Sequence, residues 1–287
     1  MAPRVLTALT LNLWNRSGRW PERLRLITRE LGELAPDVVG LQEVMRLVRP
    51  GHVEPLSAEQ DQAAEVAGEL GYAIAYAPAA DYGNGLVMGN AILSRFPIIE
   101  SLSEPLPHAG TGEPRSLGYA LVDTEWGKLP LFVTHFNWRF EHGFARLAQA
   151  IYVAGRVEAL APANAGYLPP VLMGDFNAAP DADEIRFLTG LSVQNGRSAY
   201  FADAWVYGGD GGPGATYDPR NDYARANREP ARRIDYIFVR GPDSELRGEP
   251  LRTKIVFNEP QEGPEGILWP SDHFGVYSEI AVEPRSL

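Results

Sequence analysis

Five segments of the chain are short and apolar. Each has, at one of its two ends, a polar residue able to bind a metal or move a proton. Each is short and apolar enough to form a buried β-strand. The five segments span residues 6–13, 38–44, 129–135, 171–174 and 233–240. The polar residues at their ends are Asn12, Glu43, His135, Asp175 and Asp235. Because chance would rarely place such a residue at five strand ends, we expect packed β-sheets that bring these ends to one cleft.

The other elements predict an α/β protein. Leu24, Ile27 and Leu31 share one helical face, so a first helix should begin near Pro21 and end at Pro36. Four further strands are expected at residues 72–76, 86–94, 117–123 and 276–282. Three further helices are expected at residues 57–70, 144–157 and 181–188.

Turn and cap residues set the expected boundaries of these elements. Ser57 and Gln60 suit a capping box at the start of the second helix, and Gly71 suits its end. Residues 195–230 are rich in Gly, Asp, Asn and Arg and predict long loops, which are often functional when they are large. No linker divides the strands, so residues 1–287 are expected to form a single domain.

Composition limits the classes of function. The chain has no cysteine, which excludes disulfides, zinc thiolate sites and a cysteine nucleophile. No apolar run is long enough to span a membrane, and the first residues lack the apolar core of a signal peptide, so we expect a cytoplasmic protein. The formal net charge of -11 argues against strong non-specific binding of nucleic acid. It does not exclude a nuclease, because bound divalent cations supply positive charge locally.

Two short motifs place polar residues side by side. Asp175 and Asn177 lie two apart on an extended segment and therefore share a face. A carboxylate and a carboxamide there suit an oxygen-ligated cation or a phosphate oxygen, although an Asx turn would use the same residues. Asp272 beside His273 offers a metal ligand and a proton-transfer group, although a strand-capping Asp with an incidental histidine is the commoner meaning of such a tripeptide.

Each remaining strand end also has a structural explanation when it is taken alone. Burying the Glu43 carboxylate is costly unless it is paired or bound to metal, but a strand end can also face solvent. Asn12 can form a turn, and a lone histidine such as His135 is more often structural than catalytic. Asp235 follows two arginines and can simply pair with one of them.

Taken together and in order, these motifs resemble the endonuclease/exonuclease/phosphatase superfamily, which has the deoxyribonuclease I-like fold. The resemblance runs from Asn12 to His273, nearly the whole chain, and the combined pattern is highly specific although each piece is weak. The motifs that carry it are Asn12, Leu41-Gln42-Glu43-Val44, Gly89-Asn90-Ala91-Ile92-Leu93-Ser94-Arg95, Arg115, Thr134-His135, Gly174-Asp175-Phe176-Asn177, Arg233-Ile234-Asp235-Tyr236 and Ser271-Asp272-His273.

The resemblance implies a fold and a metal site. The fold is a four-layer α-β-β-α sandwich, in which two mixed β-sheets pack face to face with helices outside. Glu43 is the implied main ligand of a divalent metal, with Asn12 and Asp272 nearby. Oxygen ligands and the absence of cysteine favour Mg²⁺ or Mn²⁺ over zinc.

The resemblance also implies catalytic roles. Asp175 is expected to orient or deprotonate the attacking water, and His273 to contact the phosphate, with Asp235 orienting its ring. His135, for which the sequence indicates no acidic partner, is expected to stabilise the phosphate or to assist the leaving group. The expected phosphate-binding residues are Arg115 and Asn177.

The expected function is metal-assisted hydrolysis of a phosphate ester by in-line attack of water, with a phosphodiester favoured over a monoester. The substrate is expected to be a nucleic acid or a small soluble phosphoester. Arginines between residues 220 and 233 suit nucleic acid, although a solvated loop explains them slightly better. A sphingomyelinase-like phospholipid phosphodiesterase ranks lower, because no long apolar insertion is present to grip a membrane.

A catalytically inactive binding module on the same fold is the alternative from a different class. It is disfavoured because every core motif position retains a usable residue. Four tryptophans either form an aromatic rim for stacking a base or sugar, or pack in the core or a lid: Trp14, Trp20, Trp138 and Trp269. We expect the protein to act as a monomer with no cofactor other than the metal.

Overall fold

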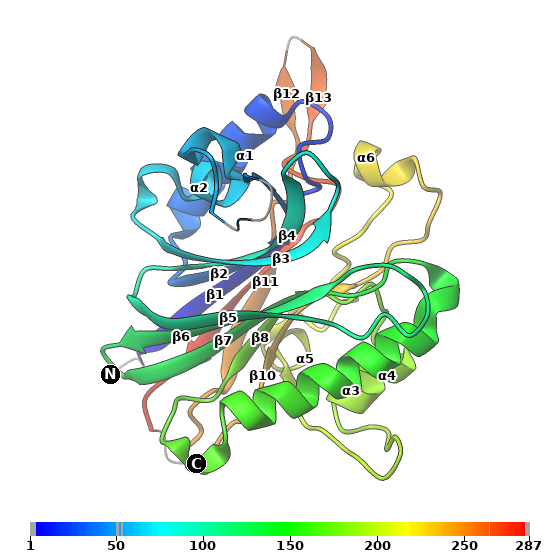
Figure 1. Ribbon diagram of the computed structural model, residues 1–287. Coiled ribbons are helices and arrows are strands. Elements are labelled where there is room, and N and C mark those ends of the chain that lie inside the picture. The colour runs from blue at the N-terminus through cyan, green and yellow to red at the C-terminus, as the bar shows by residue number, and fades with distance from the viewer. Residues whose placement is uncertain (1–3, 50–51, 53, 264, 285–287) are drawn as a thin grey trace.

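Two six-stranded β-sheets form the centre of the protein in a computed structural model that describes residues 4–49, 52, 54–263 and 265–284 (Figure 1). In spatial order, the first sheet contains β11 (Pro250–Val256), β14 (Gly275–Ala281), β1 (Val5–Asn12), β2 (Val38–Leu47), β4 (Leu86–Ser94) and β3 (Ala73–Asp81). The second contains β5 (Ile98–Pro105), β6 (Ser116–Thr124), β7 (Gly127–His135), β8 (Val171–Asp175), β10 (Asp235–Val239) and β9 (Ala202–Asp203). Both sheets are mixed, because β1–β2 and β7–β8 pair in parallel and their other neighbours pair antiparallel.

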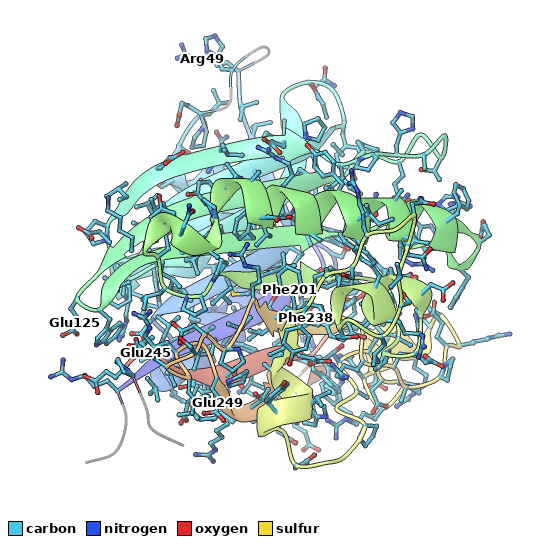
Figure 2. The ribbon with its side chains drawn as sticks, turned by 90° about the horizontal axis from the view of Figure 1, so that it is seen from below. Arg49, Glu125, Phe201, Phe238, Glu245 and Glu249 are labelled. Atoms are coloured by element: carbon cyan, nitrogen blue, oxygen red, sulfur yellow. The ribbon has the colours of Figure 1, made fainter. Side chains whose placement is uncertain are left out.

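Helices cover the outer face of each sheet (Figure 1). α1 (Trp20–Leu34) and α2 (Gln62–Ala67) lie on the first sheet, and α3 (Gly143–Leu160) and α4 (Asp183–Leu188) lie on the second. Figure 2, seen from below, shows α3 running across the second sheet. None of the helices in the described part of the chain combines the length and apolarity needed to cross a membrane. The expected four-layer α-β-β-α sandwich is confirmed.

Three hydrophobic layers hold the four layers of the sandwich together. Leu6 and Ala8 of β1 pack between the two sheets, whereas Leu9 and Leu11 of the same strand pack under α1. The central strands are therefore buried on both faces, which explains why they are apolar at nearly every position rather than at alternate ones. At Gly40 the sheets approach so closely that an added Cβ would lie 2.9 Å from Met173 Cβ.

A buried arginine fixes α1 to the two loops beside it. Arg23 is fully buried on the apolar face of the helix, and its guanidinium donates hydrogen bonds to five backbone carbonyls. The acceptors are Leu13 O at 2.8 Å, Pro270 O at 2.8 Å, Asn15 O at 3.0 Å, Ser17 O at 3.1 Å and Trp14 O at 3.4 Å. Burial lowers the pKa of Arg23 to about 10, so the side chain is still a cation at neutral pH. It joins the end of β1 to the loop before β14, two segments far apart in the sequence.

Replacing Arg23 by Met should keep much of the buried volume but leave these carbonyls without a donor. We expect the free energy of unfolding to fall by about 3–5 kcal/mol, the range for removing one partner of a buried charged interaction. Urea unfolding of the variant measures this, with Arg25→Met on the exposed face of the same helix as the control. The control should change stability by less than about 0.5 kcal/mol. Equal losses in the two variants would contradict the role given to Arg23.

The expected helix at 57–70 is wrong in its extent and in its cap. The segment forms a 3₁₀ turn (Ala58–Gln60), α2 and a second 3₁₀ turn (Gly68–Leu70). Ser57 makes no capping hydrogen bond, and Asp61 caps α2 instead by accepting from Ala63 N at 3.0 Å. The cause is Arg46, which forms a β-bridge and a 2.6 Å ion pair with Asp61 and thereby holds that residue extended.

Several edge elements were not predicted. β5 is exposed along much of its length, so it lacks the apolar run that marks the central strands. β11 and the hairpin of β12 (Gln261–Gly263) and β13 (Gly266–Leu268) were also missed, and β3 extends beyond the expected 72–76. Residues 195–230 are mostly irregular, as expected, but contain β9, α5 (Ala204–Gly208) and α6 (Asp222–Arg225).

Candidate active site

The polar strand ends lie at one end of the sandwich, opposite the end where both chain termini lie in Figure 1. β1, β2, β7 and β8 reach that end with their carboxyl termini. β6, β10 and β14 run antiparallel to them and begin there. This arrangement gathers residues from both sheets around a cavity of about 620 Å³. Of the nine residues expected in the site, seven line the cavity: Glu43, Arg115, His135, Asp175, Asn177, Asp272 and His273.

Asn12 and Asp235 lie directly behind this lining. Asn12 Nδ2 donates to Asp175 Oδ2 at 3.0 Å and to Glu43 Oε1 at 3.3 Å, so one amide connects two carboxylates. Asp235 pairs with Asp175 across β10 and β8, and its carboxylate contacts His273. All nine residues therefore belong to one connected cluster.

Asp175 is a buried carboxylate with several donors around it. Its Oδ1 accepts from Asn177 N at 2.8 Å, which is the Asx turn that the sequence also allowed. Its Oδ2 lies 3.3 Å from His135 Nε2 and 3.8 Å from His273 Nε2. Burial, aided by the like charge of Asp235, raises the pKa of Asp175 to about 7. The group can thus exchange a proton near neutral pH.

His273 is held as a cation by the carboxylates around it. Its Nδ1 donates to Asp235 Oδ2 at 3.0 Å, and the ring packs edge-on against Tyr217 with centroids 5.0 Å apart. Burial alone would lower the pKa of His273, but Asp235, Asp272 and Asp175 together raise it well above its usual value. The structural alternative for Asp235, an ion pair with one of the two preceding arginines, is not found. Arg233 pairs with Asp203 at 2.7 Å, and Arg232 pairs with Glu229.

His135 is neutral, in contrast to His273. Each ring nitrogen of His135 has a donor beside it: Arg115 Nη1 lies 3.2 Å from Nδ1, and Asn177 Nδ2 lies 3.0 Å from Nε2. Asp175 Oδ2 lies 3.3 Å from the same Nε2. Burial, with the positive charges of Arg115 and His273, holds the pKa of His135 well below its usual range. Asp175 is therefore the acidic partner that the sequence did not indicate.

An acidic neighbour fixes Arg115 in this position. Glu113 Oε1 forms an ion pair with Arg115 Nη2 at 2.5 Å. Its other oxygen accepts from Asn137 Nδ2 at 2.7 Å, and Asn137 is fully buried. The loop before β6 is thus attached to the loop after β7, and Arg115 is held between them. Asn90 of β4 donates to Ser116 O at 3.2 Å and so attaches the first sheet to the start of β6.

The carboxylates of Glu43 and Asp272 are the candidate oxygen ligands for a cation. Glu43 lies at a β-bulge in β2 with a left-handed backbone (φ 55°), which turns its side chain out of the regular alternation. Glu43 Oε2 accepts from Asn15 Nδ2 at 3.0 Å. Burial raises the pKa of Asp272 to about 6, and the nearby Glu43 carboxylate adds to the shift while His273 opposes it.

This donor set fits a hard divalent cation. Glu43 and Asp272 supply carboxylate oxygens, the ligands that Mg²⁺ and Mn²⁺ prefer, whereas Asn12 faces Glu43 with Nδ2 and its Oδ1 accepts from Trp14 N at 2.9 Å. The repulsion between the carboxylates of Glu43 and Asp272 is the kind of unfavourable interaction that a cation between them would remove. In a different group, Asp175, Asp235 and His273, the possible ligand atoms lie within 4.8 Å of one another. There the His273 ring already donates to Asp235, so it is better described as a hydrogen-bonded acid–histidine–acid group than as a ligand set.

Some functional-site residues were missed by sequence reasoning. Glu113 and Tyr217 contact candidate residues, but their segments carry no periodic or motif signal. Asn15 contacts Glu43, and its place three residues after Asn12 was the available signal for it. The helical period of α1 could have drawn attention to Arg23, because it lies four residues before Ile27 on the apolar face. Of the four tryptophans, Trp14 and Trp138 line the cavity, whereas Trp20 and Trp269 are core residues.

Comparisons with known proteins give the same fold. The sequence pattern of the Endonuclease/Exonuclease/phosphatase family matches residues 9–273. Truncated TDP2 from Caenorhabditis elegans superposes with a TM-score of 0.71 at 22% identity, covering 96% of this chain and 98% of that one. TDP2 from D. rerio, complexed with single strand DNA product, gives 0.71 at 21% identity with the same coverage. A protein described as endonuclease/exonuclease/phosphatase from Beutenbergia cavernae gives 0.67 at 24% identity, covering 97% of this chain and 72% of that one. A search of curated proteins found no match.

Proposed function

Because the chain belongs to the endonuclease/exonuclease/phosphatase family, we propose that it is a divalent-metal-dependent phosphoesterase that hydrolyses a phosphodiester by in-line attack of water. The observation that carries the proposal is the surroundings of Asp175. A buried carboxylate with a pKa of about 7 lies between a cationic and a neutral histidine, next to a cluster of oxygen ligands. Each component that phosphoryl transfer needs has a residue within this cluster.

The chain's own residues divide the work as follows. Asp175 accepts the proton of the attacking water, because a base with a pKa near the working pH is the most effective. His273, held as a cation by Asp235, neutralises charge on the phosphoryl oxygens. Arg115 and Asn177 position the phosphate. His135, held in place by Arg115 at Nδ1 and by Asn177 at Nε2, stabilises the phosphate or assists the leaving oxygen.

Glu43 and Asp272 would hold the metal ion, with Glu43 the main ligand, and Asn12 would orient the Glu43 carboxylate through Nδ2. When bound, Mg²⁺ or Mn²⁺ would polarise the phosphoryl oxygen and lower the pKa of water in the site. Mg²⁺ is the first choice, because the donors are all oxygens.

Charge favours a phosphodiester over a phosphomonoester. The residues that line the cavity include six carboxylates, those of Glu43, Asp81, Glu113, Asp175, Glu229 and Asp272. A diester brings one negative charge to these groups, whereas a monoester dianion brings nearly two at neutral pH. The smaller charge is the better match for this cavity.

An activity panel tests the proposal. It should compare bis(p-nitrophenyl) phosphate, single- and double-stranded DNA, RNA, sphingomyelin and phosphoinositides, each with Mg²⁺, with Mn²⁺ and after chelation. We expect at least one phosphodiester to be hydrolysed with metal and none without it. Full activity of the metal-free protein would contradict the metal role, and no hydrolysis of any substrate would favour a binding module.

The Glu43→Gln variant tests the metal site without relying on turnover. Removing one charge from the ligand set should weaken Mg²⁺ or Mn²⁺ binding by roughly 10- to 100-fold, the size of effect seen for groups that tune a metal site. Calorimetric titration of metal into the protein measures the affinity directly. Glu33→Gln, an exposed carboxylate on α1, is the matched control and should bind metal as the unmodified protein does. Unchanged affinity in Glu43→Gln would remove Glu43 from the metal site.

A further inference from the structure

A second cavity begins where the candidate active site ends. Pro114 and Arg115 line both cavities, so the two adjoin at the residue proposed to bind the phosphate, Arg115. The second cavity has a volume of about 690 Å³ and lies between the edge strands of the two sheets, β3 and β5. Tyr76, Pro78 and Ala79 line it from β3, and residues 101–103 and Pro105 line it from β5. It is large enough to hold one substituent of a phosphodiester.

The second cavity is almost free of charge. Among its described lining residues, Arg115 is the one permanent ion, and it belongs to the end shared with the active site. His108 also lines it, and its Nδ1 accepts a hydrogen bond from Gly110 N at 3.1 Å. The other side chains are proline, alanine, leucine, serine and tyrosine, with glycine.

Cations in the active-site cavity are already paired. Among its described lining residues the guanidiniums are Arg115 and Arg232, and each forms an ion pair with a carboxylate of the same lining, Glu113 and Glu229 respectively. A nucleic-acid strand carries a phosphate at every nucleotide, and proteins that hold such strands line the path with unpaired cations. Here a strand would place its further phosphates against paired arginines, carboxylates or an uncharged groove.

We infer that the substrate is a phosphodiester with a single phosphate and an uncharged organic substituent that lies between β3 and β5, rather than a nucleic-acid strand. The phosphate sits at Arg115, where the cavities meet, and the substituent replaces water along Tyr76, Pro78 and Leu102. This inference rests on the proposed function, because it specifies the substrate of the same site.

A length series with a salt titration tests it. The probes are thymidine 5′-(p-nitrophenyl phosphate), thymidylyl-thymidine, and oligothymidylates of about 8 and about 16 nucleotides, which bracket the usual site size for single strands. We expect kcat/KM per bond not to rise with length, and log(kcat/KM) to fall with log salt with a slope no steeper than about −0.7, the value for one phosphate. A rise with length and a slope steeper than about −2 would mean that three or more phosphates are bound and would overturn the inference.

This series distinguishes a failure of the single-phosphate substrate from a failure of the proposed phosphodiesterase function. Cleavage confined to the longer strands would overturn the single-phosphate substrate and leave the phosphodiesterase standing. No hydrolysis of any probe with Mg²⁺ or Mn²⁺ would overturn the proposed function and this inference with it.

A pair of charge variants at Ser103 tests the second cavity itself. Ser103 is exposed on β5, lines that cavity and has no part in the proposed machinery. Both Ser103→Lys and Ser103→Glu place a larger side chain in the cavity, which hinders an uncharged substituent sterically. We therefore expect kcat/KM for the p-nitrophenyl probe to fall in both variants, to values within about threefold of each other at physiological salt. A phosphate in the cavity would instead be attracted by Lys and repelled by Glu, separating the variants by about tenfold or more in opposite directions.

Ser198→Lys and Ser198→Glu are the matched controls, because Ser198 is exposed and lines a different cavity, near Arg240. They should leave kcat/KM for every probe unchanged. Changes of opposite sign in the Ser103 pair, or no change in either, would overturn the assignment of the second cavity.

Discussion

Asp175→Asn is expected to lower kcat by roughly 10³- to 10⁴-fold, the upper part of the range for a positioned general base. The substitution keeps the shape of the side chain and one oxygen, which can still accept from Asn177 N, but it removes the group that takes the proton of water. Asp181→Asn is the control, because Asp181 is an exposed carboxylate on the loop after the same strand. A loss below about 10-fold would mean that Asp175 is not the base.

The same assignment predicts how kcat changes with pH. Asp175 must be deprotonated to act, and its pKa is raised to about 7, so kcat should rise as the pH increases through about 7 and should fall only at higher pH, where His273 loses its proton. That rising limb should be absent in Asp175→Asn. If the limb persists in the variant, another group sets it.

Stability should move the opposite way from activity in the same variant. A carboxyl group whose pKa is raised by folding contributes its stability below its unfolded pKa of about 4, and that stability is lost as the pH rises through the folded value of about 7. At pH 8 the charged Asp175 therefore costs stability, whereas the neutral amide of the variant does not. Thermal unfolding at pH 8 should give Asp175→Asn a Tm equal to or above that of the unmodified protein, which also excludes misfolding as the cause of lost activity.

Much of the fold was predictable because the central strands carry a strong and local signal. The segments at 6–13 and 171–174 are buried on both faces, so their apolar runs are visible in the sequence without knowledge of their partners. β5 was not predictable for the opposite reason: its side chains are largely exposed, and pairing with β6 makes it a strand. The break before α2 depends on Arg46, which is remote from that segment in the expected secondary structure.

The candidate site divides in a similar way. Residues at the ends of apolar strands, such as Glu43 and Asp175, stand out because a polar group there needs an explanation. Glu113 and Asn15 lie in loops, and their contacts with Arg115 and Glu43 exist only once both sheets are packed. The lowered pKa of His135 likewise depends on its burial in the folded protein and on the charge of Arg115, 20 residues away in the chain, and no spacing rule indicates it.

Asp235→Asn is expected to lower kcat by roughly 10²-fold or more, the size of effect seen on losing one electrostatic group at a transition state. Asp235 Oδ2 accepts from His273 Nδ1 at 3.0 Å and helps to raise the pKa of that histidine. The cation is needed, so activity should be lost as the pH rises through the pKa of His273. Removing the Asp235 charge lowers that pKa, and the falling limb should therefore move to lower pH. Asp203→Asn, which breaks the ion pair with Arg233 on the neighbouring strand, should leave this limb in place.

The double variant decides through which residue Asp235 acts. Asp235 also lies opposite Asp175 in the β8–β10 pairing and raises its pKa, so it has a second route to the reaction. If it acts through His273, Asp235→Asn combined with His273→Ala should lower kcat little more than His273→Ala alone, because residues that work as one unit are non-additive. Additive losses, together with a rising limb that moves to lower pH while the falling limb stays, would place its action on Asp175 instead. The kcat and pH profiles of the three variants separate the two routes, because each route moves a different limb.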